Sequence, residues 1–429
     1  MLLCSYAAFI FLQNSISAVF LYLLFYMPIQ KITIEEFLLL AKTNTVLDVR
    51  SPGEFTHAHI PNAYNLPLFN DEERAKVGTV YKQQSREEAI KIGLDFFGPN
   101  MKAVVEKVEA IVTSYRLGVT GLNSLKKSNS TTKKSNNKVE NSQLINPQPA
   151  TFHPQPVTPK PATILIHCWR GGMRSAAVAW LLDLYGFKVY TLIGGYKAYR
   201  NWTLEQFAKE YNFKIIGGYT GSGKTLLLHA LAKENNSIVD LEGLAHHKGS
   251  ALGALGNPPQ PTQEMFENLL AEKLAIESGV FNLSTPADCQ RPTANCIFLE
   301  DESQRIGDLQ IPMPLWYCMR KAPVYFVDIP FEERLNYLTA EYGIHPKEQL
   351  VNAIMRIQKR LGGLETKNAI NFLLENNFKE SFRILLHYYD KWYAKGLYNR
   401  EGAEILIRKI PAELVNTEQN IELIKLNIN

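Results

Sequence analysis

The chain has 429 residues, which is enough for two or three domains with cores of their own. Its hydrophobic fraction of 46% and charged fraction of 21% are those of an ordinary globular protein, not of a disordered or fibrous one. The formal net charge of +4 permits a polyanionic partner without requiring one, and the five cysteines lack the CxxC spacing of a zinc knuckle.

The first stretch of the chain is apolar. Residues 1–26 contain no charged side chain, and Lys31 is the first charge in the sequence. Such a stretch can be read as a membrane span, but polar residues interrupt its middle. It also lacks the basic start and the clear cleavage site of a signal peptide. We interpret it as a leader upstream of the true start at Met27, with a membrane anchor as the alternative, and expect a cytoplasmic protein without stable membrane association.

An α/β domain is predicted over residues 28–205. The run KITIEEFLLL predicts a short strand and a helix, and TVLDVRS predicts a buried strand. The phrase DVRSPGEFTHAHIPNAYNLPL resembles the first half of a rhodanese domain, although Ala58 and Asn62 stand where that family carries glycines. We expect Asp48 and Arg50 to brace this fold through hydrogen bonds rather than to do chemistry.

Two insertions separate the halves of this domain. Residues 70–117 carry apolar side chains at three- and four-residue spacing, which predicts amphipathic helices. Residues 118–161 are rich in Lys, Ser, Asn, Thr and Pro and contain too little apolar surface to form a core. We interpret this second insertion as disordered and solvated; the alternative is that its lysines contact a nucleic acid.

Cys168 follows an apolar strand and opens the loop HCWRGGMRS, which leads into a helical pattern. Loop amides and the start of a helix favour negative charge at this point, so a thiolate, persulfide or selenide would be stabilised. Arg170 and Arg174 are placed to attract an anionic donor such as thiosulfate, phosphate or selenophosphate. The Cys-x5-Arg spacing also fits a phosphatase, but the rhodanese phrases favour chalcogen transfer. The expected catalytic residues are Cys168, Arg170 and Arg174.

A second glycine-rich loop, GYTGSGKT, lies between an apolar strand and an amphipathic helix and matches the P-loop pattern. Its backbone amides would hold a pair of phosphates, Lys224 would reach the terminal phosphate, and the Thr225 hydroxyl would contact Mg²⁺. We expect a P-loop NTPase-like domain over residues 210–330. The predicted phosphate-binding residues are Gly218, Gly221, Ser222, Gly223, Lys224 and Thr225.

Acidic residues close two later strands of this domain. The predicted strand in SIVDLEGL ends at Asp240 and Glu242. The predicted strand in CIFLEDES ends at Glu300 and Asp301. An acid at the end of a strand near a P-loop is a typical Mg²⁺ ligand. Either pair could serve, and each acid could equally cap the helix that follows it.

Residues 331–429 are predicted to be helical, with recurring basic and aromatic side chains. Arg356, Lys359 and Arg360 fall on one helix face, where they could contact RNA phosphates. The alternative is that this face is simply solvated.

The motifs HCWRGGMRS, GGYTGSGKT, DLEGLAHHKGSALG and FLEDESQRIG together resemble the tRNA 2-selenouridine synthase family, from about Ile29 to the C-terminal helices. The resemblance implies an enzyme that exchanges sulfur for selenium at C2 of 2-thiouridine, at the wobble position of certain tRNAs. It implies selenophosphate as the selenium donor, an S-geranyl intermediate made with geranyl diphosphate, and an enzyme that supplies selenophosphate as a partner. The expected fold is a rhodanese-like parallel-sheet domain, a P-loop NTPase-like α/β domain and a helical C-terminal region.

Other interpretations of the two loops stay open at this point. The P-loop could bind geranyl diphosphate or a nucleotide, and Cys168 could carry selenium covalently or only position the donor. One alternative function is a rhodanese-type sulfurtransferase fused to a P-loop ATPase or small-molecule kinase. Another is a non-catalytic RNA-binding ATPase, which the presence of both Cys168 and Lys224 disfavours.

Overall fold

The computed structural model describes residues 29–116, 162–279 and 296–428. The apolar leader at 1–26 and the insertion expected to be disordered at 118–161 lie outside the described residues. No helix among those described is both long and apolar enough to span a membrane. The chain divides into two compact units, Met1–Pro52 with Asn62–Tyr196 and Gly53–Pro61 with Lys197–Asn429.

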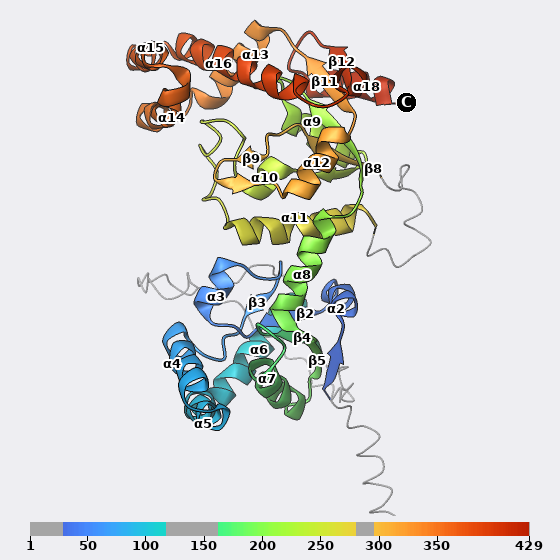
Figure 1. Ribbon diagram of the computed structural model, residues 1–429, viewed down its shortest axis with the longest axis vertical. Helices are drawn as coiled ribbons and strands as arrows, with labels where there is room; N and C mark the ends of the chain where they lie inside the picture. The colour runs from blue at the N-terminus through green and yellow to red at the C-terminus, as the bar shows by residue number, and fades with distance from the viewer. Residues whose placement is uncertain (1–28, 117–161, 280–295, 429) are drawn as a thin grey trace, which may run out of the picture. The chain divides into compact units, whose positions relative to one another are not determined.

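The first unit is built on a parallel five-stranded sheet in the order β1-β5-β4-β2-β3 (Figure 1). Strand β2 is buried along its whole length, and only the first residue of β4 is partly exposed. Both strands are apolar-rich, as expected where helices cover both faces of a parallel sheet. The strands are β1 Gln30–Ile32, β2 Thr45–Asp48, β3 Tyr64–Asn65, β4 Thr163–His167 and β5 Lys188–Leu192.

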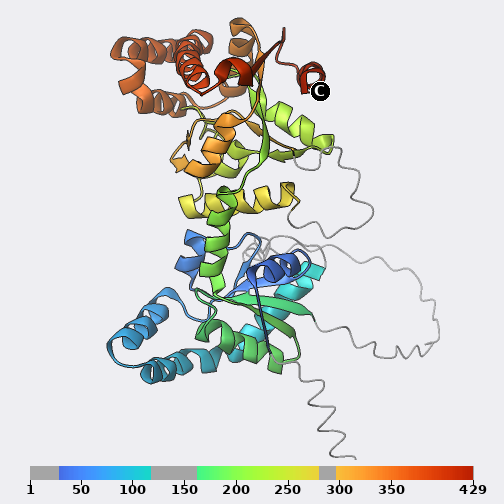
Figure 2. The ribbon, with the colours of Figure 1, turned by 45° about the vertical axis from the view of Figure 1, so that its right-hand side comes forward.

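Helices pack against this sheet, and Figure 2 shows α6 and α7 beside it. Val108 of α6 and Val178 of α7 belong to one core with Ile166 of β4. The segment expected to be helical at 70–117 holds α4, α5 and α6, and α4 begins at a capping box between Asn70 and Glu73. The helices are α2 Ile34–Ala41, α3 Pro52–His57, α4 Asp71–Gln83, α5 Arg86–Phe97, the 3₁₀ helix η1 Gly98–Asn100, α6 Met101–Arg116 and α7 Met173–Leu184, with α8 Gly195–Phe207 crossing into the second unit.

The second unit has its own parallel five-stranded sheet, in the order β12-β11-β6-β8-β7. Its strands are β6 Asn212–Gly217, β7 Ser237–Val239, β8 Cys296–Glu300, β11 Val324–Asp328 and β12 Ile407–Pro411. A separate antiparallel pair joins β9 Arg305–Ile306 and β10 Leu309–Gln310. The expected α/β class is therefore confirmed.

Strand β12 corrects the expectation that residues 331–429 are helical throughout. It pairs in parallel with β11, with Val324 opposite Ile407, and forms an edge of the second sheet. A strand this short carries little periodicity of its own, and its partner lies far earlier in the chain. An edge position also tolerates Pro411 at its end, because that residue need not donate to the ladder.

The remaining helices of the second unit cover the sheet or extend from it. Helices α13 to α16 share a core that includes Leu335, Leu350, Leu373 and Phe382, and Figure 1 shows them in orange and red beside one another. The helices are α9 Lys224–Lys233, α10 Leu241–Ala245, α11 Gln263–Glu277, α12 Met313–Lys321, α13 Phe331–Tyr342, α14 Lys347–Leu361, α15 Gly363–Leu374, α16 Phe378–Tyr398, α17 Ala403–Leu406 and α18 Thr417–Ile428.

A buried ion pair braces the first unit. Asp48 and Arg50 are both at most 1% exposed, and the Arg50 Nη2 atom lies 2.6 Å from Asp48 Oδ2. The guanidinium also stacks over the ring of Tyr196, 3.8 Å from its centroid. Burial by itself disfavours the charged carboxylate, but nearby His167 and Arg50 outweigh this, so the pKa of Asp48 lies below its ordinary value.

Asp48→Asn should destabilise the first unit by about 3–5 kcal/mol, because it leaves a buried guanidinium without its carboxylate. Since the pKa of Asp48 is lowered by folding, the pair stabilises fully above the unfolded value of about 3.9 and loses its effect as pH falls through the folded value. The wild-type protein should therefore lose stability on acidification below about pH 4 more steeply than the variant.

Hydrogen exchange of the β2 and β4 amides, followed against pH, measures this effect locally. Asp95→Asn, at an exposed position of α5, is the matched control and should change nothing. Unchanged protection in Asp48→Asn would show that the pair is dispensable for the fold.

Candidate active site

Cys168 lies directly after β4, in the loop before α7. Its side chain is 3% exposed, and its Sγ atom lies 3.3 Å from the hydroxyl of Ser175. That hydroxyl donates to the carbonyl of Gly172 at 3.0 Å, so it is available to Sγ as an acceptor in this arrangement. Ser175 would have to turn its proton toward a thiolate to stabilise it. Sequence reasoning missed this residue, although it closes the HCWRGGMRS motif.

Two glycines let the cysteine loop lie directly against the turn after β5. A Cβ atom on Gly171 would lie 2.5 Å from the carbonyl oxygen of Leu192, and one on Gly195 would lie 2.2 Å from that of Cys168. Both glycines have positive φ, which other residues rarely adopt. The amide of Tyr196 then donates to the Cys168 carbonyl at 2.8 Å. This close backbone packing fixes the loop beside the thiol.

The two predicted arginines occupy different positions on this loop. Arg170 is exposed in the loop itself, and Arg174 is partly buried in the first turn of α7. Arg170 thus lies in the segment that joins Cys168 to α7, and Arg174 lies in the helix itself. Two cations therefore follow the thiol closely along the chain.

The P-loop runs from the end of β6 to the start of α9. Gly218, Gly221 and Gly223 all have positive φ, and Gly223 caps the helix. The Lys224 ammonium donates back to the Gly218 carbonyl at 3.1 Å, across the loop. Ser222 is 1% exposed, and its hydroxyl has no hydrogen-bond partner among the described residues. The predicted phosphate-binding residues are thus brought together in one loop.

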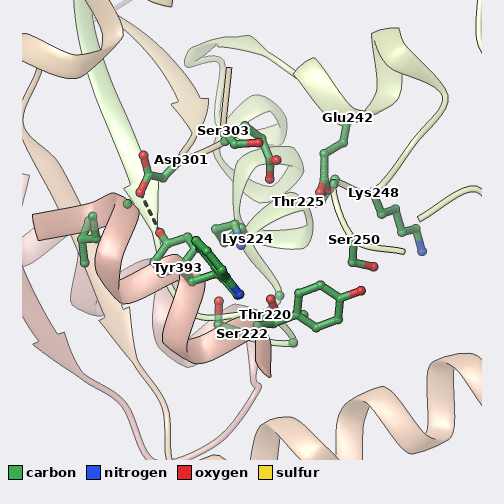
Figure 3. Close-up of a pocket in the computed structure, with 18 of the residues that line it drawn as sticks. Thr220, Ser222, Lys224, Thr225, Glu242, Lys248, Ser250, Asp301, Ser303 and Tyr393 are labelled. Carbon is green, nitrogen blue, oxygen red and sulfur yellow. Dashed lines mark hydrogen bonds between the residues drawn. The ribbon is translucent and has the colours of Figure 1, made fainter. Parts of the chain in front are cut away.

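A cavity of about 510 Å³ opens above this loop (Figure 3). In Figure 3, the labelled residues Thr220, Ser222, Lys224 and Thr225 border it from the loop. Aromatic and apolar side chains from three helices complete the lining, namely Trp316, Tyr337, Leu338, Tyr342, Tyr389, Trp392, Tyr393 and Leu397. The cavity therefore joins a phosphate-binding end to an aromatic wall.

Of the four predicted acids, Glu242 lies closest to the phosphate-binding machinery. The Thr225 hydroxyl donates to its Oε2 atom at 2.7 Å. Glu300 holds the backbone of Glu242, because its Oε1 atom accepts a hydrogen bond from the Glu242 amide at 2.8 Å. Burial, and then the charges of Asp240 and Glu242, raise the pKa of Glu300 well above its ordinary value. Glu300 therefore supports the backbone of Glu242 from a fully buried position.

The other two acids, Asp240 and Asp301, have structural partners, and Asp301 also lines the cavity. Asp240 caps α10 by accepting the Gly243 amide at 2.6 Å, and it also contacts His229 at 2.6 Å. Asp301 accepts hydrogen bonds from Arg400 at 2.7 Å and from the Tyr393 hydroxyl at 2.8 Å. The capping alternative thus fits Asp240, and an ion pair that joins distant parts of the chain fits Asp301.

Glu302 is an acid of this cavity that sequence reasoning passed over. It lines the cavity, and its carboxylate lies so close to Gly249 that a Cβ atom there would be 2.6 Å from Oε2. Burial raises its pKa well above the ordinary value, and the charge of Glu242 adds to this, while Lys224 opposes it. Its place in the FLEDES run, next to two predicted acids, was the available signal.

Helices α13 and α16 hold the P-loop from outside. The Gly218 amide donates to the Tyr393 hydroxyl at 3.1 Å. Arg334 donates to the Thr220 carbonyl at 3.1 Å and forms a bidentate pair with Asp390 at 2.7 and 2.9 Å. Sequence reasoning missed Arg334 and Tyr393, because they lie more than a hundred residues beyond the loop and carry no local motif.

The predicted tRNA-contacting residues lie elsewhere in the second unit. Arg356, Lys359 and Arg360 are exposed on α14, and none of the ion pairs found among the described residues includes them. Across residues 29–116, 162–279 and 296–428, no group of three or more His, Cys, Asp and Glu side chains is arranged to hold a metal ion.

Comparison with known proteins gives independent assignments for both units. Residues 33–104 match the family model of the rhodanese-like domain. Residues 211–422 match the model described as the tRNA 2-selenouridine synthase AAA domain. The two matches fall on the two units that carry Cys168 and the P-loop.

Curated relatives match most of the chain. A tRNA 2-selenouridine synthase of Sulfurovum sp. is 31% identical over 85% of this chain and 91% of its own length. That of Bdellovibrio bacteriovorus is 30% identical over 83% of this chain and 89% of its own. That of Serratia proteamaculans is 36% identical over 69% of this chain and 64% of its own. With its rhodanese and P-loop units both matched, the chain belongs to the tRNA 2-selenouridine synthase family.

Proposed function

We propose that this chain replaces sulfur by selenium at C2 of wobble 2-thiouridine in tRNA, with selenophosphate as donor and S-geranyl-2-thiouridine as intermediate. The observation that carries the proposal is the cavity that joins the P-loop to an aromatic wall. A prenyl diphosphate needs both ends, a loop for its diphosphate and an apolar wall for its tail.

The shape and lining of the cavity suit geranyl diphosphate. Ligand pockets bury most of a small ligand in about 300–1,000 Å³ of mostly apolar space with a few polar groups, and this cavity of about 510 Å³ falls in that range. Loop amides and Lys224 would take the diphosphate, and Tyr342, Tyr389 and Leu338 offer apolar surface for the tail. Each buried CH₂ group contributes about 0.8 kcal/mol, so the tail adds substantially to the affinity.

Mg²⁺ fits the polar end of this cavity. It prefers oxygen ligands and is usually held by one or two carboxylates together with substrate phosphates. The Thr225 hydroxyl and the Glu242 carboxylate, 2.7 Å apart, would hold it, with Glu302 nearby in the cavity. Bound there, the ion would neutralise charge on the diphosphate.

The first half-reaction is alkylation of sulfur. The sulfur at C2 forms a bond to C1 of the geranyl group, the C1–O bond breaks, and the electron pair leaves with diphosphate, while the N3 proton of the base is released to solvent. Lys224 and the loop amides are placed to stabilise that leaving group. In the second half-reaction the selenium of selenophosphate bonds to C2, and the C2–S bond breaks to release geranyl thiol, which is a better leaving group than sulfide. Hydrolysis of the Se–P bond then releases phosphate.

Selenium delivery falls to the first unit. Selenophosphate is an anion, and Arg170 and Arg174 border the loop that carries Cys168. The thiol would hold the donor beside the tRNA, because an S–Se bond between Cys168 and the selenide-level selenium of selenophosphate would need a two-electron oxidant. A selenophosphate-supplying enzyme is the expected partner.

Purified protein with 2-thiouridine-containing tRNA and geranyl diphosphate should yield S-geranyl-2-thiouridine. Addition of selenophosphate should then yield 2-selenouridine. Mass spectrometry of the digested nucleosides follows both products. A protein that forms neither product, but transfers sulfur from thiosulfate and hydrolyses ATP, would instead be a sulfurtransferase fused to an ATPase.

Lys224→Ala should weaken binding of geranyl diphosphate by about 10- to 150-fold, since it removes charge-assisted hydrogen bonds worth about 1.5–3 kcal/mol. Geranylation of the tRNA should be lost first. Selenation of tRNA that is already geranylated should be less affected. Calorimetric titration with geranyl diphosphate, inorganic diphosphate and ATP measures the effect. Lys233→Ala, exposed at the other end of α9, is the matched control. A variant that binds and transfers geranyl normally but loses ATP would assign the loop to a nucleotide.

Cys168→Ser should abolish selenium incorporation while geranylation continues, because the change is nearly isosteric and lies in the other unit. The assay is conversion of geranylated tRNA to 2-selenouridine with selenophosphate. Cys318→Ser, in the second unit, is the control and should retain activity. Near-native selenation by Cys168→Ser would remove the thiol from the reaction.

A further inference from the structure

One side of the cavity is bordered by cation–aromatic pairs from two helices. On α12, the Arg320 guanidinium carbon lies 5.5 Å from the ring centroid of Trp316. On α16, the Lys395 ammonium lies 5.3 Å from the ring centroid of Trp392. Trp316, Arg320 and Trp392 all line the cavity. We call these four residues the α12–α16 rim.

The two helices are joined at this rim. Arg320 Nη2 donates to the carbonyl of Gly396 at 2.9 Å, and Gly396 also lines the cavity. The hydrogen bond runs from the last turn of α12 to the last turns of α16. The rim is therefore a continuous feature of the second unit rather than two separate helix ends.

The rim contains side-chain groups that are available to a ligand. Trp392 is 48% exposed, and the Trp316 Nε1 atom is buried without a hydrogen-bond partner among the described residues. The ion pairs found in the described part of the chain include neither Arg320 nor Lys395. Burial, and then the charge of neighbouring Arg400, lower the pKa of Arg320, while Asp301 and Tyr393 oppose this shift.

These groups match unpaired nucleotides. Single-stranded RNA is bound by aromatic rings that stack on its bases and by cations that take its phosphates. Cation–aromatic pairs supply both at one place. Helix α14 differs, because its sequence from Lys347 to Leu361 contains no aromatic residue. Arg356, Lys359 and Arg360 could hold phosphates but could not stack a base.

We propose that the α12–α16 rim binds unpaired nucleotides of the tRNA anticodon loop and that the wobble base passes this rim into the cavity. The proposal rests on the proposed function, since alkylation of the base requires it to reach the diphosphate end of the cavity. A base held in a stack cannot enter a pocket, so it must be turned out and received by other flat groups. Trp316 and Trp392 are the flat groups at this border.

Binding of an RNA hairpin that carries the anticodon loop with 2-thiouridine at the wobble position tests the rim. Fluorescence anisotropy at each of several salt concentrations, without geranyl diphosphate or selenophosphate, gives the Kd. Trp392→Ala should weaken binding by about tenfold, the loss expected for one stacked base, and Trp392→Phe should recover most of it. Lys395→Ala should lower the slope of log affinity against log salt by about one. Trp180→Ala, a similarly exposed tryptophan on α7 of the first unit, is the matched control.

An affinity of Trp392→Ala within twofold of the wild type would overturn the proposal. So would an equal loss in Trp180→Ala, because the effect would then not belong to the rim. Replacement of Arg356, Lys359 and Arg360 that lowered the affinity while Trp392→Ala did not would place the RNA on α14 instead. A protein that binds the hairpin through the rim but never transfers geranyl would leave this inference intact and count against the proposed function.

Discussion

The Tyr393 hydroxyl joins the P-loop to the C-terminal helices, and the cavity depends on that connection. It accepts the Gly218 amide and donates to Asp301, which Arg400 holds from the other side. Burial, and then the charge of Asp301, raise the pKa of Tyr393 well above its ordinary value, so the hydroxyl keeps its proton. One side chain thus ties β6, the end of β8 and α16 together. The same helix carries Trp392 and Tyr389, so the link that secures the loop also positions the aromatic wall.

The two anion-handling loops use the same backbone device for different chemistry. Each follows a parallel strand and precedes a helix, where unpaired amides favour negative charge. In the first unit, Gly171 and Gly195 allow close backbone packing beside Cys168, whose thiol contacts Ser175. In the second, three glycines with positive φ shape the turn, and Lys224 and Thr225 supply a charge and a hydroxyl.

The acidic side chains near the cavity differ in their burial and in their hydrogen-bond partners. Glu300 is fully buried, its pKa is raised well above the ordinary value, and it supports the backbone that presents Glu242. Glu242 accepts a hydrogen bond from the Thr225 hydroxyl, while Asp301 is paired with Arg400. Such an arrangement limits the number of uncompensated charges in a low-dielectric site.

The sequence alone determined the fold class, the two loops and the family, because these depend on local patterns. An apolar strand, a glycine-rich turn and a helix start lie within a few residues of one another, so HCWRGGMRS and GYTGSGKT can be interpreted without a structure. The tertiary structure decided which acid faces the P-loop, that β12 completes the second sheet, and that Arg334, Glu302 and Tyr393 belong to the site. Asp240 and Glu242 are two residues apart and chemically alike, yet one caps a helix and the other meets Thr225. Only the packing of distant segments separates such neighbours, since it sets the burial, the partners and the direction of each side chain.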